Sequence, residues 1–433
     1  MNFDLMRSLL IDRTLRGELS SYSNSVAAEE KSLNEQKTKP FQIPYDWQWK
    51  CVADCVQFNP KVIQDDTAEV SFIPMADVEP GFVDQCSTRQ TKLWAKVKKG
   101  FSRFQEGDLL VAKITPCFQN RKSCVAKNLT NGTGAGSTEF HVMRCVSGVD
   151  AKFLLFFFKS EYFIRYGVNH FNGTVGQQRV GTQDIKDCLV PVPPFEEQTR
   201  IVEKLEAAFV EIDRAEKAYE ELQTLSGVLR GQILQEAIQG KLVPQLAKEG
   251  VVEHIGAAPD EVPFEIPESW QWVQLNRICT LKSGVDMSPS VLLNEPVVDS
   301  IPYITGGSQI GQSGELLITR WTSKATNISE KGDVLLICKG SGLGRTALNS
   351  YGSVHIARQI MAIRKTKEAI PQYLDLLLKW RWESLRSAAK GVIPGISRKD
   401  VLSLLVPLPP VTEQVRIVAK VDDLLKQVNA LSA

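Results

Sequence analysis

The chain has 433 residues, a formal net charge of +1, 43% hydrophobic residues and 23% charged residues, which is the composition of an ordinary globular protein of two or three domains. A charge so close to zero excludes a global basic field, so any nucleic-acid surface must be a local patch. No apolar run approaches the about 20 residues of a membrane span, no signal-peptide pattern is found, and the nine cysteines are scattered. We therefore expect a cytoplasmic protein with reduced thiols.

Two segments near the N-terminus return later in the chain at a constant offset of 223 residues. A short helix is expected over Asp4 to Leu19, and part of its pattern recurs towards Leu242. After a polar linker, the segment 40–49 matches the segment 263–272 in seven of ten positions, including the Trp-Gln-Trp with which each copy ends. The chain therefore contains an internal duplication.

Each copy of the Trp-Gln-Trp pattern begins a globular stretch, from Trp49 to about Cys188 and from Trp272 to about Leu404. Their interiors match weakly but in the same order. Gly-Asp turns precede predicted buried strands, a second strand follows, and an apolar stretch then predicts a buried helix. The matching segments are 106–110 with 331–335, 140–144 with 360–364, and 153–159 with 373–379.

A longer match, at an offset of 216 residues, joins Leu189 to Lys204 with Leu405 to Lys420, where 11 of 16 positions are identical. Prolines suit a helix start, and carboxylates in the first turn favour it. Apolar residues then recur every three or four positions, which is typical of a coiled-coil seam. In the first copy the seam residues are Ile201, Leu205, Ala208, Ile212, Ala215, Tyr219, Leu222, Ser226, Leu229 and Ile233. The charged residues between them are interpreted as a solvated face.

We therefore predict an α+β fold with two similar globular domains, separated by an antiparallel pair of long coiled-coil helices that is pseudo-twofold and circularly permuted. The predicted parts are an N-terminal half-helix at 1–22, a first domain at 23–188, a central helical region at 189–245, a second domain at 246–404 and a C-terminal half-helix at 405–433.

Two divergent domains on a stiff spacer suit a partner with two separated, unlike sites, as duplex DNA has. Residues 89–127 contain ten basic and two acidic side chains, which is a local footprint for phosphates. Glycine-rich loops carry the Arg, Lys and Gln side chains that read base edges, although each such loop also fits an ordinary surface turn. The candidate DNA-contacting residues are Lys113, Arg121, Lys122, Gln177, Gln178, Arg179, Lys339, Ser341, Arg345, Arg358, Gln359 and Arg398.

Three sequence features carry a resemblance to a known protein family. They are the doubled Pro-Pro-x-x-Glu-Gln at 193–198 and 409–414, the Ile-Pro-x-x-Trp starts at Ile43 and Ile266, and the helix end at Gly240. The chain resembles, over essentially its whole length, the DNA-specificity subunit of type I restriction-modification systems. The resemblance implies a non-catalytic subunit with two target recognition domains, each reading half of a split, asymmetric target. It also implies partners: two methylation subunits that use S-adenosylmethionine, and restriction subunits driven by ATP.

Catalytic motifs are not convincing in this sequence. Val192 to Phe195 is interpreted as a helix start rather than a methyltransferase motif, and the run 132–136 as a flexible loop rather than a nucleotide site. The glycine-rich segment 339–346 lacks the Gly-Lys-Ser/Thr of a P-loop, and Cys51 with Cys55 has no second ligand pair for zinc. No cofactor or metal is expected in this chain. A coiled-coil scaffold for protein or RNA partners, without DNA sequence reading, is the alternative.

Overall fold

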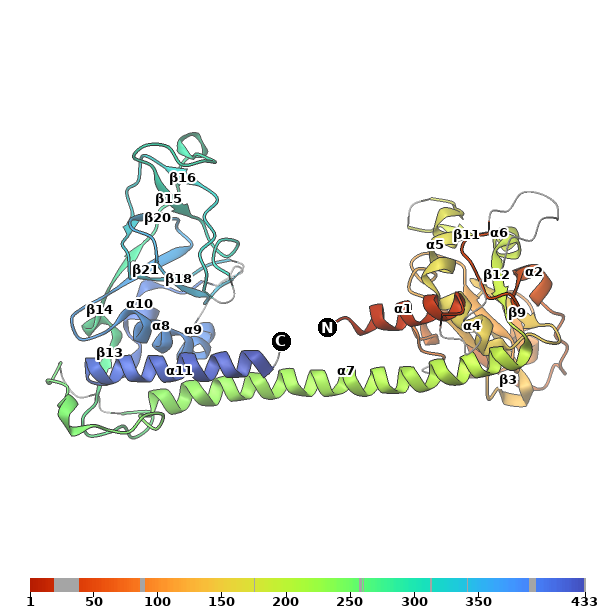
Figure 1. Cartoon of the computed structure of the whole chain (residues 1–433), viewed down its shortest axis with the longest axis horizontal. Coiled ribbons are helices and arrows are strands. Elements are labelled where there is room, and N and C mark those ends of the chain that lie inside the picture. The colour runs from red at the N-terminus through yellow and green to blue at the C-terminus, as the bar shows by residue number, and fades with distance from the viewer. Residues whose placement is uncertain are drawn as a thin grey trace. The chain divides into compact units, whose positions relative to one another are not determined.

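The computed structural model describes residues 1–18, 39–85, 90–174, 176–256, 259, 261–311, 314–340, 342–388 and 395–431. The chain divides into unit 1, Met1–Tyr219, and unit 2, Glu220–Ala433. The division falls inside the long helix α7 (Phe195–Ile238), so each unit contains a globular domain and part of that helix (Figure 1). Most of the predicted polar linker, and the ends of the predicted half-helices, lie outside the described residues.

In its described residues, unit 1 has two four-stranded sheets, a two-stranded ribbon and a short hairpin. The first sheet has the order β2 (Val56–Phe58), β9 (Phe140–Cys145), β6 (Leu109–Ala112), β7 (Ser123–Val125). The second has the order β4 (Gln90–Leu93), β3 (Glu69–Ile73), β8 (Thr133–Gly136), β5 (Ser102–Gln105). The ribbon is β1 (Gln48–Cys51) with β12 (Leu189–Val192), and the hairpin is β10 (Phe171–Asn172) with β11 (Arg179–Val180). Its helices are α1 (Phe3–Leu15), α2 (Val52–Cys55), α3 (Trp94–Val97), α4 (Ala151–Lys159), α5 (Glu161–Asn169) and α6 (Thr182–Asp187).

Unit 2 repeats these sheets. Its first sheet has the order β14 (Cys279–Ser283), β21 (Ile360–Lys365), β18 (Val334–Ile337), β19 (Thr346–Leu348). Its second has the order β16 (Trp321–Thr322), β15 (Ile301–Ile304), β20 (Val354–Ile356), β17 (Ile328–Ser329). The ribbon is β13 (Gln271–Gln274) with β22 (Leu405–Leu408). Its helices are α8 (Pro371–Trp380), α9 (Trp382–Ala388), α10 (Arg398–Leu402) and α11 (Val411–Leu431).

The two units share strand directions as well as strand order. In each second sheet, one central pair is parallel, β3 with β8 and β15 with β20, while the first sheets are antiparallel throughout. Common topology in segments with weak sequence similarity confirms the predicted α+β duplication. The strands expected at 109–110, 140–144, 334–335 and 360–364, and the two buried helices, are all found.

One expectation about this region was wrong. The glycine-rich run 132–136 is not a flexible loop, because residues 133–136 form the buried strand β8 at the centre of the second sheet. A Cβ on Gly134 would lie 2.1 Å from the ring of Phe104, and a Cβ on Gly136 would lie 2.1 Å from Ile73 O. These glycines therefore permit close packing rather than chain mobility.

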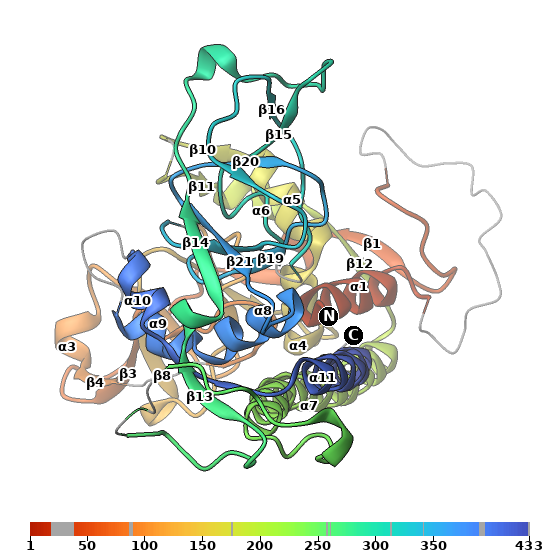
Figure 2. The ribbon, with the colours of Figure 1, turned by 90° about the vertical axis from the view of Figure 1, so that its left-hand side faces the viewer.

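The helices pair in the same antiparallel register in each unit. In unit 1 the ring of Phe3 on α1 contacts that of Tyr219 on α7, and Arg7 reaches back to Asp213. In unit 2 Arg230 on α7 donates to Asn429 on α11, and Figures 1 and 2 show these two helices side by side. Since Arg7 and Arg230 are 223 residues apart, and Asp213 and Asn429 are 216 apart, the order of parts is permuted as predicted. Most predicted seam residues are buried or half-buried.

Each helix pair shares one hydrophobic core with its own globular domain. Ile11 of α1 and Leu205 of α7 belong to the same cluster as the phenylalanines of α4, and Ile417 of α11 belongs to that of Tyr373 on α8. The domain is thus packed onto its helices rather than tethered to them. No helix in the described parts of the chain is long and apolar enough to span a membrane.

Candidate nucleic-acid interface

In unit 1, two of the candidate segments, the one at Lys113 and the one at 177–179, meet at the edge of the first sheet where β6 ends and β9 begins. Lys113 N donates to Glu139 O at 2.9 Å, and Val180 N donates to Lys113 O at 3.0 Å. Thr115 N donates to Gln178 O at 2.9 Å, so the β10–β11 hairpin is fixed against the segment that follows β6. Lys113, Gln178 and Arg179, which are up to 66 residues apart in the sequence, therefore lie together.

Arg179 is held at this edge by a carboxylate that the sequence did not single out. Its Nη2 lies 2.9 Å from Glu139 Oε1 and its Nε lies 3.0 Å from Glu139 Oε2, which is a two-pronged ion pair. The side chain of Arg179 is 44% exposed, and the hydrogen bond from Arg179 lowers the pKa of Glu139. The guanidinium is thus oriented yet open to solvent. Gln177 next to it is exposed, and Lys113 is half-buried.

Unit 2 has the equivalent edge, where β18 ends and β21 begins. Cys338 N donates to Gln359 O at 2.8 Å and Ile396 N donates to Cys338 O at 3.0 Å, which repeats the two bonds made by Lys113 in unit 1. An isolated bridge between Lys339 and Gly395 repeats that between Ile114 and Arg179. The candidates Lys339 and Gln359 therefore occupy the place that Ile114 and Glu139 occupy in unit 1.

The two edges agree in backbone geometry but not in side chains. Unit 1 presents Lys113, Gln178 and Arg179, whereas unit 2 presents Lys339, Arg358 and Gln359. Arg358 is 71% exposed in its side chain and pairs with Asp286 at 2.8 Å, as Arg179 pairs with Glu139. Arginine, lysine and glutamine are the side chains that donate to base edges and phosphates, and the two edges offer different sets of these donors.

A family model described as the type I restriction modification DNA specificity domain matches residues 44–224 and 267–433. The chain belongs to this family. It is a DNA-specificity subunit, with one family domain in each duplicated half. No group of three or more His, Cys, Asp or Glu side chains suited to a metal ion is found among the residues that the structure describes.

Individual relatives agree with the family match over nearly the full chain. The specificity subunits of the type I restriction enzymes EcoAI and EcoEI from Escherichia coli are 27% and 26% identical. The alignments cover 98% and 99% of this chain, and 89% and 90% of those proteins.

Solved structures show the same fold. A chain from a study of complex assembly and conformational transition of the type I R-M system has a TM-score of 0.72 at 23% identity, covering 91% of this chain and 93% of its own. The HsdS subunit of Thermoanaerobacter tengcongensis has a TM-score of 0.60 at 22% identity, covering 90% and 92%.

Other candidate residues of this specificity subunit serve internal contacts. Arg121 donates to Lys159 O at 2.9 Å and to Glu161 at 2.6 Å, and Lys122 donates to Met75 O at 3.1 Å. Arg345 donates to Gly307 O at 3.2 Å, and Arg398 to Leu281 O at 2.9 Å. Ser341 lies outside the described residues. For these side chains DNA contact stays a prediction, and a contact would have to share or break the bonds just given.

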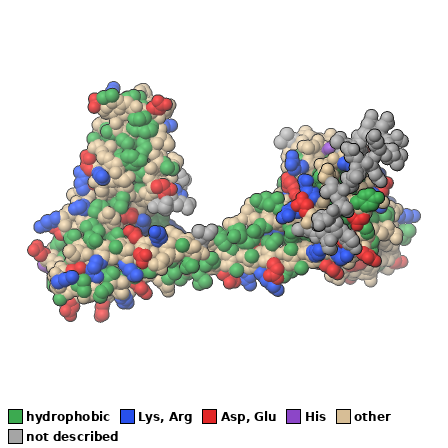
Figure 3. All heavy atoms as spheres, in the orientation of Figure 1, with side chains coloured by type: hydrophobic (Ala, Val, Ile, Leu, Met, Phe, Trp, Pro, Cys, Tyr) green, Lys and Arg blue, Asp and Glu red, His purple; other side chains and the backbone are tan. Residues whose placement is uncertain are grey.

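The basic excess predicted at 89–127 is partly neutralised by acids from other segments. Lys98 lies 2.5 Å from Asp66, and Lys127 lies 2.5 Å from Asp84. Lys92 lies over the ring of Phe72. On the face shown in Figure 3, basic and acidic side chains are interspersed rather than gathered into one field. Counting charge along the sequence therefore overstates the positive potential of this segment.

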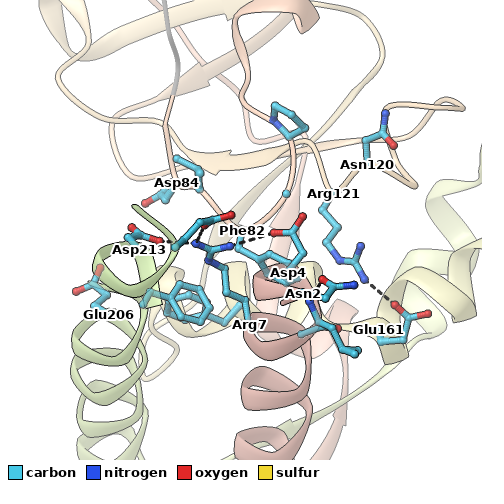
Figure 4. A pocket seen from close by; sticks show the side chains of 18 of the residues that line it. Asn2, Asp4, Arg7, Phe82, Asp84, Asn120, Arg121, Glu161, Glu206 and Asp213 are labelled. Carbon is cyan, nitrogen blue, oxygen red and sulfur yellow. Dashed lines mark hydrogen bonds and ion pairs between the residues drawn. The ribbon is translucent and has the colours of Figure 1, made fainter. Parts of the chain in front are cut away.

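A cleft of about 1280 Å³ in unit 1 lies between the first turns of α1, the middle of α7 and the loops around Phe82 and Arg121. Figure 4 shows that both arginines in it are directed at carboxylates, Arg7 at Asp4 and Asp213, and Arg121 at Glu161. Through these ion pairs, the two arginines connect neighbouring loops and helices within unit 1 of the specificity subunit. The DNA candidates at the sheet edge do not line this cleft.

Proposed function

We propose that this specificity subunit reads a bipartite, asymmetric DNA target, one half with the sheet edge at Lys113, Gln178 and Arg179 and the other half with the edge at Lys339, Arg358 and Gln359. The observation that carries the proposal is the equivalence of the two edges in backbone and their difference in side chains. A duplicated scaffold with unlike contact groups suits two unlike half-targets, whereas identical edges would suit a palindrome.

The same proposal assigns the helices to spacing and assembly. Helices α1, α7 and α11 would set the gap between half-targets and dock two methylation subunits, with restriction subunits joining that core. Catalysis would then belong to the partners, with S-adenosylmethionine bound by the methylation subunits and ATP by the restriction subunits. Support comes from membership of the specificity family and from apolar side chains exposed on these helices, such as Leu5 on α1 and Val228 on α7.

The test is to map modified adenines in cells that carry the subunit with its methylation partners, and in cells that lack it. We expect one bipartite motif with unlike halves and a constant gap. Arg179→Ala should change methylation at bases of one half only, and Gln359→Ala at bases of the other half only. Modification without sequence preference, or a palindromic motif, would contradict the proposal.

The alternative of a scaffold for protein or RNA partners predicts a different outcome. Purified complex would then bind single-stranded RNA and unrelated duplexes as well as the mapped target does. Family membership favours DNA. A competition assay between the mapped target, unrelated duplexes and single-stranded RNA separates the two hypotheses. All competitors must be compared at one salt concentration, because non-specific phosphate binding falls steeply as salt rises.

A further inference from the structure

The Gln of the doubled Pro-Pro-x-x-Glu-Gln motif makes the same three hydrogen bonds in each unit. In unit 1, Gln198 Nε2 donates to Pro193 O at 2.9 Å and to Gly148 O at 3.1 Å, while its Oε1 accepts from Asp150 N at 2.8 Å. In unit 2, Gln414 Nε2 donates to Pro409 O at 2.9 Å and to Glu368 O at 2.8 Å, while its Oε1 accepts from Ile370 N at 2.9 Å. Both side chains are fully buried.

These bonds join the start of one helix to the start of another. Gln198 lies in the first turn of α7, and Asp150 is the N-cap residue of α4. Gln414 lies in the first turn of α11, and Ile370 is the N-cap residue of α8. Helices α4 and α8 in turn pack on β6–β7 and β18–β19. Each glutamine therefore connects a spacer helix, through α4 or α8, to the sheet whose edge carries the DNA candidates.

We call the three hydrogen bonds of Gln198, and the matching three of Gln414, the joint of each unit. The chemistry of this joint requires an amide side chain. Its two carbonyl partners need two donor hydrogens and its N–H partner needs an acceptor, and only a primary amide side chain supplies two donors and an acceptor together. Glutamate lacks the donors, and methionine, of similar length, lacks both. Because the site is buried, water does not replace the lost bonds without reopening the packing.

We propose that Gln198 and Gln414 are positioning residues that set the angle between each recognition domain and its own helix, and thereby the gap between half-targets that the subunit accepts. The proposal rests on the proposed function, since it assumes a bipartite target with a constant gap. Its distinctive consequence is that the joint controls spacing and leaves base reading unchanged. A purely structural role would lower binding to every duplex by the same factor.

The experiment uses the complex with methylation subunits and duplexes in which the two mapped half-targets are separated by the natural gap, or by one base pair more or fewer. The quantity compared is the ratio of the binding constant for the natural gap to that for each altered gap. In Gln198→Met and in Gln414→Met this ratio should fall about tenfold, which corresponds to the net free energy of about one hydrogen bond. The penalty for a base substitution within either half should stay as in the wild type.

A matched control is Leu154→Ala, which removes fully buried side-chain volume from α4 without touching the joint. It should lower stability and keep the ratio between gaps. Gln variants that keep the wild-type ratio while binding falls uniformly would overturn the proposal and leave the proposed function intact. A wild-type complex indifferent to the gap would overturn both.

Hydrogen exchange on the unaltered complex covers the case in which both variants fail to fold. The amides of Asp150 and Ile370 should exchange as slowly as those in the middle of α7, because each is closed by a buried acceptor. Rapid exchange at both amides would show that the joints open freely, and would overturn the proposal without any variant.

Discussion

Arg7 Nη2 lies 2.7 Å from Asp213 Oδ1, across the contact between α1 and α7. The duplicated position has Arg230 Nη2 at 2.9 Å from Asn429 Oδ1, across α7 and α11. The duplication has thus kept the register of the helix pair and exchanged a carboxylate for an amide. Arg7 also pairs with Asp4 and Glu216, and its side chain is 10% exposed.

We expect Arg7→Met to lower the free energy of unfolding of unit 1 by about 1 kcal/mol, because its partner carboxylates are largely solvated and the ion pairs are therefore screened. Amide hydrogen exchange in α1 measures the change for this unit alone. Arg230→Met in α7 is the matched control for the contact with α11 and should cost less, since Asn429, to which Arg230 donates, is a neutral, exposed amide. Equal losses at the two positions would contradict the prediction.

A second duplicated pair lies in each first sheet, at the end opposite to the candidate edge, where β6 and β18 begin and β9 and β21 end. Asp108 is buried and accepts from Arg144 Nε at 2.7 Å and Nη2 at 2.9 Å, and Asp333 accepts from Arg364 at 2.9 Å with both nitrogens. Asp108→Asn should destabilise unit 1 by about 2 kcal/mol, somewhat less than breaking a fully buried pair because the Arg144 side chain is a third exposed. Thermal unfolding measures this, with the exposed Asp46→Asn as control. A loss no larger than that of the control would count against the pair.

At the sheet edge, Arg179→Ala should weaken binding to the mapped target by about 1–3 kcal/mol if the guanidinium reads a base, and less, uniformly across sequences, if it contacts phosphate. Glu139→Gln should strengthen binding, because it removes a carboxylate that competes for the same guanidinium. Fluorescence anisotropy with the assembled complex measures both. Lys152→Ala, which breaks an ion pair with Glu206 on the helix side of the domain, should leave DNA affinity unchanged.

His141 makes the stability of unit 1 sensitive to acid. It is 3% exposed, its Nε2 lies 3.1 Å from Val180 O, and burial lowers its pKa to about 4. As the pH falls, the unfolded chain binds this proton first, near its ordinary pKa of about 6.5, so stability is lost between about pH 6.5 and 4, by about 3 kcal/mol in all.

The matched variant for this prediction is His141→Met, because methionine stands at the equivalent position 361 of unit 2. It should flatten the dependence of unfolding on pH over that interval, measured by urea titration at several pH values. An unchanged slope in the variant would show that other groups cause the acid sensitivity.

The backbone conformation of two glycines gives a physical reason for two of the repeated sequence signatures, the helix-ending glycine and the Ile-Pro pair. Gly17 and Gly240 have φ of 76° and 71° just after a helix, and an added Cβ would lie 2.2 Å from Pro44 and 2.5 Å from Pro267. Alanine at either position would be strained by its φ and blocked by the proline ring. The Ile-Pro signature and the helix-ending glycine are therefore two halves of one contact in each unit.

The sequence by itself determined the duplication, the helix seam and the α+β class of both domains, because these depend on periodicity and on repeats that survive at constant offsets. It also indicated the loops that form the two sheet edges, although not that the edges are equivalent. Only the tertiary structure decided which basic side chains are available. Arg121 and Arg364 are held by Glu161 and Asp333, which lie 40 and 31 residues away in the chain.

The glycine run at 132–136 shows the same division between local pattern and fold. Its composition is that of a loop, and it becomes a central strand because Phe104 and Ile73 come from other strands to occupy the space that side chains would fill. Local composition indicates which conformations a segment can adopt. The residues that pair with its charges and pack against it come from distant parts of the chain, and only folding brings them close. Availability at a binding surface is thus a property of the packed domain rather than of the segment.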